Sequence, residues 1–374
     1  MGSGPTLVLT TSILTVAALT LSGCSDDSPP VDDLGVVEVE ELDLPQGDAF
    51  LSPDGERIAT YASDELCIYS AEGDEERCLG EELSLDAASI RWSPDSSQLV
   101  YTENFYKYFL EPDVWVLDAE SGEPTNLTDD GVAADDMDIA ETAETEETDG
   151  PDLDGSPTWV DDDTIRFLRW HRSDDAVAIM EVTDDGGDPE QIGELATDTP
   201  PTLISYTADD RVAYARITEQ DVVTAGLDGE DVETVFDAGL AVPEVSSDGD
   251  EVLVATYPMS YALDEMPPSE IVTSDGEEVG SIDGQLRWAA WRTDGDGLAY
   301  AELDEENPEE VIVRLAEDAT ADGREVESGE YAAPYRMATG RAPVWSTQDT
   351  MLLIDMSEAD SDELRYVLMH FGEE

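Results

Sequence analysis

The chain has 374 residues, of which 93 are Asp or Glu and only 16 are Lys or Arg, so its formal net charge is −77. This charge argues against a nucleic-acid partner, because phosphate contacts need cations and a strongly negative field repels polyanions. Forty per cent of the residues are hydrophobic, which is enough apolar material to build a sizeable core and argues against a disordered acidic chain.

The charge also bears on the solvent in which the protein works. Lys107 is the only lysine, and all other cationic side chains are arginines apart from the two histidines. At ordinary ionic strength such a surface repels itself, whereas in molar salt the Debye length falls to about 3 Å. We therefore interpret the chain as halophilic; the alternative is codon bias in a GC-rich genome, which replaces Lys by Arg.

Residues 1–23 are predicted to form a signal peptide. Residues 7–21 are an apolar stretch, too short for a membrane span and of the right length for an h-region. The stretch ends in Leu21-Ser22-Gly23-Cys24, which resembles the lipobox of bacterial-type lipoproteins. The resemblance implies that cleavage precedes Cys24, that its thiol is acylated, and that the lipid anchors the protein to the cell membrane, facing the periplasm or the extracellular side.

Two details of this leader depart from that pattern. The n-region contains no Lys or Arg, and Gly2 with Thr6 also matches a myristoylation motif. We disfavour myristoylation, because an apolar h-region has no role in a cytosolic protein. Residues 24–35, rich in Ser, Asp and Pro, are expected to be a flexible tether.

A motif recurs along the chain from residue 51 onward. At residues 92–101 it reads Trp-Ser-Pro-Asp and leads to Leu-Val-Tyr, with nine positions between its first and last residues. An aromatic residue, a Pro/Asp/Gly turn and a β-rich run predict two strands joined by a tight turn. Five clear copies and two degenerate ones begin near residues 51, 92, 159, 205, 245, 291 and 345.

The spacing of these copies predicts the fold. They lie 49 residues apart on average, and each is followed by an alternating third strand and a weaker fourth, as after residue 114. Four short strands in a period of about 40–50 residues are typical of a β-propeller blade. We therefore predict an all-β fold, a seven-bladed β-propeller of four-stranded antiparallel blades over residues 36–374.

The repeat resembles the WD40-like repeats of the TolB-type propeller family, in which a Trp-Ser-Pro-Asp-Gly turn precedes Leu-Ala-Tyr. Residues 118–128, which end in Asn126-Leu127-Thr128, are similar to the blade ending of this family. The resemblance covers about residues 50–374. It implies the propeller fold and protein or envelope partners, and it identifies no site residue.

The remaining cysteines predict a disulfide. Without Cys24 the chain retains Cys67 and Cys78, an even number as expected in an oxidising compartment. If Glu72 and Gly73 form a two-residue hairpin turn, the two cysteines face one another across the strands, close enough to bridge. The alternative is two buried free thiols.

The two ends of the chain are predicted to meet. The last repeat offers only three strands, near residues 342–346, 351–356 and 364–371. Residues 36–40 read as a strand that belongs to no repeat. We assign them as the missing outer strand of the last blade, which would close the ring.

Three loops between the second and third strands of their blades depart from the acidic background. The topology places these loops on one face together with the blade-to-blade connections. Aromatic side chains beside Arg are typical of binding hot spots, which suggests a site for a protein partner or a small ligand; alternatively, they pack over the blade edges and the arginines neutralise nearby acids. The candidates are Phe105, Tyr106, Lys107 and Tyr108 in blade 2, Arg169, Trp170, His171 and Arg172 in blade 3, and Tyr257 and Tyr261 in blade 5.

Residues 129–155 form an insertion on the same face. It is rich in Asp, Glu, Ala and Thr and contains no Lys or Arg, a composition typical of disorder. It could cover the cationic loops, although a solvated strap is the simpler interpretation.

Catalytic motifs are scarce. The chain contains no Gly-x-Ser-x-Gly elbow, His-Glu-x-x-His or Gly-rich phosphate loop, and His370, in an apolar strand, is expected to be structural. The acidic segments 152–155 and 294–297 do not complete a calcium loop. We predict no metal and no cofactor.

We therefore interpret the protein as a monomeric, lipid-anchored, non-catalytic propeller that binds a protein or a ligand. The alternative is a lactonase- or lyase-like enzyme that uses the central channel. That interpretation requires a polar cluster or a metal from several first strands, whereas segments 242–244 and 342–344 look mostly apolar. A third interpretation is a surface spacer without a ligand.

Overall fold

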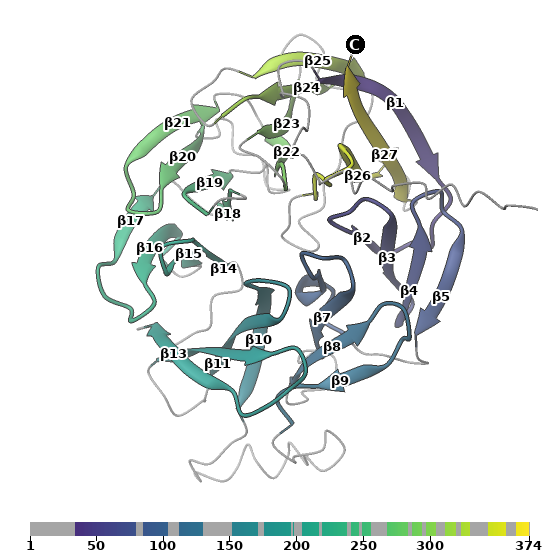
Figure 1. The fold of residues 1–374 in the computed structure, drawn as a ribbon. Coiled ribbons are helices and arrows are strands. Elements are labelled where there is room, and N and C mark those ends of the chain that lie inside the picture. Colours follow the sequence, from purple (N-terminus) through teal and green to yellow (C-terminus); the bar gives the residue numbers. More distant parts are fainter. Residues whose placement is uncertain are drawn as a thin grey trace, which may run out of the picture.

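Seven small sheets stand around a central hub in the computed structural model (Figure 1). Six of them have four antiparallel strands in simple chain order, and the seventh joins the two ends of the chain. The seven-bladed β-propeller predicted from the repeat is thus confirmed. The structure describes residues 34–79, 85–103, 112–129, 152–170, 176–195, 197, 204–216, 219–237, 241–246, 249–255, 268–282, 286–293, 297–303, 311–318, 323–329, 343–356 and 364–373.

The strands of each blade run from the hub outward. Blade 1 has β2 (Asp48–Leu51), β3 (Arg57–Ala62), β4 (Glu65–Ser70) and β5 (Glu75–Leu79). Blade 2 has β6 (Arg91–Trp92), β7 (Gln98–Thr102), β8 (Val114–Asp118) and β9 (Pro124–Asn126), preceded by the 3-10 turn η2 (Ala87–Ser89). Blade 3 has β10 (Leu153–Trp159), β11 (Thr164–Trp170), β12 (Val177–Thr183) and β13 (Glu190–Leu195).

The remaining blades follow the same plan. Blade 4 has β14 (Ile204–Tyr206), β15 (Arg211–Arg216), β16 (Asp221–Gly226) and β17 (Glu233–Phe236). Blade 5 has β18 (Val242–Val245), β19 (Glu251–Ala255), β20 (Ser269–Thr273) and β21 (Glu278–Ile282). Blade 6 has β22 (Leu286–Trp291), β23 (Leu298–Leu303), β24 (Val311–Ala316) and β25 (Arg324–Gly329). Blade 7 has β26 (Thr350–Met356), β27 (Leu364–Glu373) and β1 (Leu34–Leu42).

The repeated turn explains why this sequence folds into hairpins. In blade 1, Ser52 Oγ donates to Asp54 Oδ1 at 2.5 Å and accepts the N–H of Arg57 at 3.0 Å. The side chains thereby satisfy backbone groups that the tight turn leaves unpaired. Gly55 has a φ of +75°, and a Cβ there would lie 2.6 Å from Ser346 Oγ of blade 7. Glycine therefore serves both the turn and the close approach of two blades.

Three blades have a shorter turn, which the sequence predicts for blade 3, where the motif is one residue shorter, but not for blades 4 and 7. Seven positions separate the residues that pair across the turn in blade 1, from Leu51 to Ile58. Only six do so in blades 3, 4 and 7, where the pairs are Trp159↔Ile165, Tyr206↔Val212 and Trp345↔Met351. The fourth copy of the motif therefore aligns on Tyr206 rather than on Ser205, because strand pairing sets the register.

The ring closes as predicted. β1 pairs antiparallel with β27 from Leu34↔Glu373 to Leu42↔Tyr366, with one bulge at Val36/Glu38. β1 begins two residues earlier than expected, so Leu34 belongs to the blade, where it is fully buried. The innermost strand expected near residues 342–346 is reduced, within the described residues 343–346, to the bridge from Trp345 to Met351.

Neighbouring blades are joined at the hub by tryptophans of the repeat. In three of the four blades with a tryptophan at this position, the indole N–H donates to the backbone carbonyl of the residue before the equivalent position in the preceding blade. The three pairs are Trp92 to Phe50 at 2.9 Å, Trp159 to Arg91 at 3.3 Å and Trp291 to Glu244 at 3.3 Å. Each ring is buried in the core that two blades share, so this aromatic position both fills and orients the blade interface.

The predicted cysteine pair is a disulfide. Cys67 on β4 lies opposite Cys78 on β5, with an S–S distance of 2.01 Å and a Cα–Cα distance of 4.0 Å. The turn is not the expected Glu72-Gly73 pair. The N–H of Gly73 instead bonds to the carbonyl of Ser70 at 3.0 Å, and a bulge at Ile68/Tyr69 absorbs the extra residue before the strands reach the cysteines.

Within the described residues, no helix has both the length and the apolar character needed to cross a membrane.

Candidate functional site

The loops between second and third strands lie at the same end of the blades as the blade-to-blade connections, because the four strands of each blade alternate in direction. Most of the predicted binding residues fall on these loops outside the described residues. They are Phe105, Tyr106, Lys107, Tyr108, His171, Arg172, Tyr257 and Tyr261. Arg169 and Trp170 lie at the end of β11 and are described.

Arg169 is engaged within the molecule. Its Nε and Nη2 donate to the two carboxylate oxygens of Asp154 at 2.8 and 2.7 Å, and its Nη1 lies 3.5 Å from Asp152. The Asp154 side chain is only 2% exposed. The hydrogen bond to Asp154 raises the pKa of Arg169, and burial raises the pKa of Asp154 against the opposing pull of Arg169. For this residue the structure supports the alternative in which arginine neutralises nearby acids.

The pairing of Arg169 with Asp154 also bears on two expectations from the sequence. Asp152 and Asp154 do not form a calcium loop, because β10 begins at Leu153 and the Asp154 carboxylate is bound to Arg169. Residues 153–155, which the composition assigned to the acidic insertion, are the first residues of blade 3.

A second polar network fixes the neighbouring connection of blade 2. Asn126 Nδ2 and Thr128 Oγ1 donate to the carboxylate of Asp113 at 2.7 and 3.3 Å, and the N–H of Val114 donates to Thr128 Oγ1 at 2.9 Å. The N–H of Asp154 bonds to the carbonyl of Pro112 at 3.1 Å. The start of blade 3 is thus attached to the base of the blade 2 loop.

Glu103 closes the other side of that loop. Its Oε2 accepts the N–H of Asp113 at 2.9 Å and its Oε1 accepts the indole N–H of Trp115 at 2.7 Å. Burial, reinforced by the charge of Asp113, raises the pKa of Glu103 to about 7. One carboxyl group thus holds both ends of residues 104–111.

Trp170 is part of a blade interface. It packs against the cluster that blades 3 and 4 share, beside Ile204 and Tyr206. Its indole N–H is buried and has no hydrogen-bond partner in the described part of the chain. The tryptophan therefore supports the base of the blade 3 loop by packing, as the alternative interpretation of the aromatic residues expects.

The positions before the repeat aromatics are more often polar than the sequence analysis suggests. Six of these seven residues lie on inner strands, where alternation along the strand turns the side chain toward the next blade. Ser205 shows this direction, because its Oγ donates to the carbonyl of Pro243 at 3.0 Å. The seven positions are Phe50, Arg91, Thr158, Ser205, Glu244, Ala290 and Val344. Four of the seven are polar, whereas segments 242–244 and 342–344 alone indicated an apolar hub.

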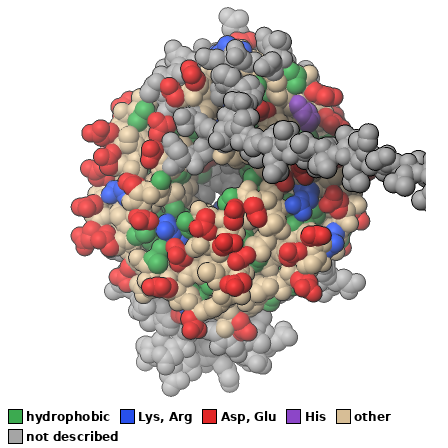
Figure 2. Space-filling model, viewed as in Figure 1, with side chains coloured by type: hydrophobic (Ala, Val, Ile, Leu, Met, Phe, Trp, Pro, Cys, Tyr) green, Lys and Arg blue, Asp and Glu red, His purple; other side chains and the backbone are tan. Residues whose placement is uncertain are grey.

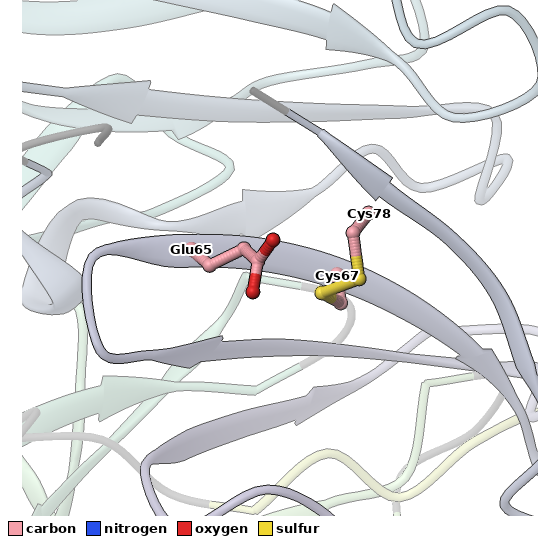
Figure 3. Close-up of side chains that lie close together, drawn as sticks. All are labelled: Glu65, Cys67 and Cys78. Carbon is pink, nitrogen blue, oxygen red and sulfur yellow. A yellow bond between two sulfur atoms is a disulfide. The ribbon is translucent and has the colours of Figure 1, made fainter. Parts of the chain in front are cut away.

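One group of possible metal ligands occurs within the described residues. Ligand atoms of Glu65, Cys67 and Cys78 lie within 4.8 Å of one another, and Figure 3 shows the Glu65 side chain directed toward the sulfur atoms. Both sulfurs are used in the disulfide. This leaves one exposed carboxylate, which does not make a metal site.

His370 lies in β27, opposite Glu38 and Thr350. Its Nε2 is 4.0 Å from Glu40 Oε2, and its neighbours Met369 and Phe371 are buried. This placement agrees with the structural role expected from the sequence.

The comparisons with known proteins concern the fold. No protein-family model and no curated protein matches the chain. An oligogalacturonate lyase in complex with manganese aligns with a TM-score of 0.57 and 12% identity over 92% of each chain. The RRP9 WD40 repeats align with a TM-score of 0.57 and 8% identity over 90% of this chain and 99% of that chain. A putative TolB from Agrobacterium tumefaciens covers 76% of this chain and 81% of its own at 13% identity.

The TM-score of the TolB match is 0.38, which carries no argument. At these identities the likeness shows the fold alone, and the similar structures include both a lyase and a WD40 repeat protein. These likenesses agree with the β-propeller fold of this chain.

Proposed function

We propose that the protein is an exported, lipid-anchored β-propeller that binds a protein partner or a small ligand at the cell envelope without catalysing a reaction. Binding takes place on the face that carries the loops between second and third strands. Cys24 carries the lipid, and the signal peptide directs export.

The attachment of the blade 2 and blade 3 loop bases to one another carries this proposal. Glu103 and Asp113 hold the ends of the blade 2 loop, and Asp154 bonds to Pro112 and to Arg169 at the end of β11. A binding surface benefits from such a frame, since preorganised loops lose less entropy when they bind. The bases of the two loops are thereby attached to one another.

The frame, formed by Glu103, Asp113, Asp154 and Arg169, limits the choice of variants that can test the proposal. Arg169 belongs to the frame, so its replacement would disturb the fold and is unsuitable as a binding test. Lys107 and Arg172 are cationic residues of the two loops that do not belong to this frame. We expect wild-type protein immobilised in molar salt to retain envelope proteins or ligands that Lys107→Glu/Arg172→Glu retains at least tenfold less, provided both have the same circular dichroism.

Glu123→Gln, on the opposite end of blade 2, is the matched control and should retain wild-type binding. Equal recovery of every bound molecule by wild type and the double variant would overturn the role of these loops.

A second function is favoured by the polar hub positions. Arg91, Thr158, Ser205 and Glu244 lie on the innermost strands of four blades, around the hub, and one structure of similar fold is a lyase. If the channel is catalytic, incubation with oligogalacturonate and manganese should yield unsaturated products, and Glu244→Gln should abolish them. Unchanged substrate would exclude this reaction.

A further inference from the structure

Arg91 occupies an unusual position for a cation. It lies on β6, the innermost strand of blade 2, in the ring of strands around the hub (Figure 1). Its Nη1 donates to the carbonyls of Ala88 and Ile90 at 2.6 and 3.2 Å. Its Nε and Nη2 make no hydrogen bond within the described part of the chain, and the side chain is half-buried.

No carboxylate of the described residues forms an ion pair with this side chain. Asp86 is the acid that acts on it, from beyond ion-pair distance, and Asp86 Oδ1 already accepts the N–H of Ala88 at 3.1 Å. Burial lowers the pKa of Arg91 to about 9 against the weaker pull of Asp86. A partly buried charge is usually paired with an opposite one, so a half-buried cation without an ion pair among the described residues, in a chain of charge −77, needs an explanation.

Two other arginines of the same chain show what fits the Nε/Nη2 edge of a guanidinium. Arg169 Nε and Nη2 bind the two oxygens of Asp154 at 2.8 and 2.7 Å, and Arg216 Nε and Nη2 bind those of Asp221 at 2.8 and 2.5 Å. The two parallel N–H groups match the spacing of carboxylate oxygens. In Arg91 the same two groups have no carboxylate partner among the described residues.

The surroundings of Arg91 are formed by its own strand and by the next blade. The adjoining inner strand β10 lies against β6 and η2, and the indole N–H of Trp159 on β10 donates to the carbonyl of Arg91 at 3.3 Å. In the space-filling view an opening is visible near the centre of the ring, with acidic side chains around it (Figure 2). The acidic surroundings favour a small monovalent acid over a polyanion, because repulsion grows with the charge of the ligand.

We propose that the Nε/Nη2 edge of Arg91 is a binding site in the propeller hub for the carboxylate of a small organic acid. The site is distinct from the loop face, so loss of one leaves the other unaffected.

Acetate is the probe. At a fixed sodium concentration in the molar range, replacing chloride by acetate should raise the Tm of wild-type protein saturably by about 2 °C or more, because a ligand that binds only the folded state stabilises it. Arg91→Met, which removes the charge at similar volume, should lose this saturable increase. Arg91→Lys keeps the charge without the paired donors and should weaken acetate binding at least tenfold by calorimetry.

Arg57→Met is the matched control. The Arg57 guanidinium on the neighbouring blade bonds to the carbonyl of Ser96 at 2.5 Å and lies over the Trp92 ring, so this variant should respond to acetate as wild type does. The proposal is wrong if wild-type protein shows no saturable response to acetate or if Arg91→Lys binds it unchanged. An Arg91-dependent response that is equal for chloride and acetate would also overturn the carboxylate assignment.

Discussion

Arginine side chains hold neighbouring blades together. Three arginines lie over the repeat aromatic of the next blade, and a fourth bridges to a backbone carbonyl there. They are Arg57 over Trp92 at 5.4 Å, Arg166 over Tyr206 at 5.6 Å, Arg292 over Trp345 at 5.5 Å, and Arg211, which donates to Ser274 O at 2.8 Å. A planar guanidinium stacks on a ring and still donates hydrogen bonds at its edge. The ammonium group of lysine is not planar and cannot stack in this way. These interfaces give a structural reason for arginine in a chain with one lysine.

At the same scale, Glu103 makes stability depend on pH. Its pKa in the folded protein, about 7, lies above the ordinary value of 4.5, so its contribution to stability is complete below about pH 4.5 and is lost as the pH rises through 7. Glu103→Gln stays neutral. We expect the free energy of unfolding of wild type relative to Glu103→Gln to fall by up to about 3 kcal/mol between pH 4.5 and 8.

Denaturant titrations in molar salt at several pH values measure this difference. Glu120→Gln, at an exposed turn of the same blade, is the control and should show no comparable change. A constant difference between wild type and Glu103→Gln across the pH range would contradict the prediction.

Among the elements, β1 has the largest effect for its length. It supplies the outer strand of blade 7 and buries Leu34 in the core between blades 6 and 7. A chain that begins at residue 43 should therefore unfold at a much lower denaturant concentration than one that begins at residue 34, because loss of β1 leaves the edge of β27 unpaired and the ring open.

A synthetic peptide of residues 34–42 tests whether this effect comes from β1 itself. Added in trans, it should restore part of the stability by pairing with β27. Equal stability of the two chains, measured by denaturant titration, would show that β1 does not close the ring.

The disulfide stabilises a single hairpin. It closes a loop between residues 11 positions apart, so Cys67→Ser/Cys78→Ser should lose about 2–3 kcal/mol of unfolding free energy, mainly because the unfolded chain gains freedom. Free-thiol titration of the denatured, unreduced wild-type protein should find neither cysteine. Detection of both thiols would contradict the bridge.

At the scale of the whole molecule, charge repulsion opposes the compact ring. The visible face in Figure 2 carries acidic side chains over nearly all blades, and the chain has a formal charge of −77. We expect transfer from molar to millimolar salt to unfold the protein, because the Debye length grows from about 3 Å to 10 Å or more. Circular dichroism measures this transition, and an unchanged spectrum would refute adaptation to salt.

Local chemistry was sufficient to predict much of this fold. The turn of Ser, Pro, Asp and Gly is satisfied by its own side chains, so each copy specifies a hairpin wherever it occurs, and the spacing of the copies specifies the blades. The strand at residues 36–40 was identifiable because the last repeat lacks a partner for it. Cys67 and Cys78 were paired by counting across one hairpin. All these inferences depend on contacts between residues that are close in sequence or on the count of repeats.

Only the tertiary structure decided what the side chains do. Arg169 resembled a binding residue because its partner Asp154 lies on another strand, within a segment that looks like an acidic insertion. The indole N–H groups of Trp92, Trp159 and Trp291 find carbonyls in the preceding blade, 42 to 68 positions away. Arg91 differs from Arg169 because Asp86, the acid that acts on it, lies beyond ion-pair distance. These roles depend on how one blade packs against the next. The local sequence does not show which residues of two blades come into contact.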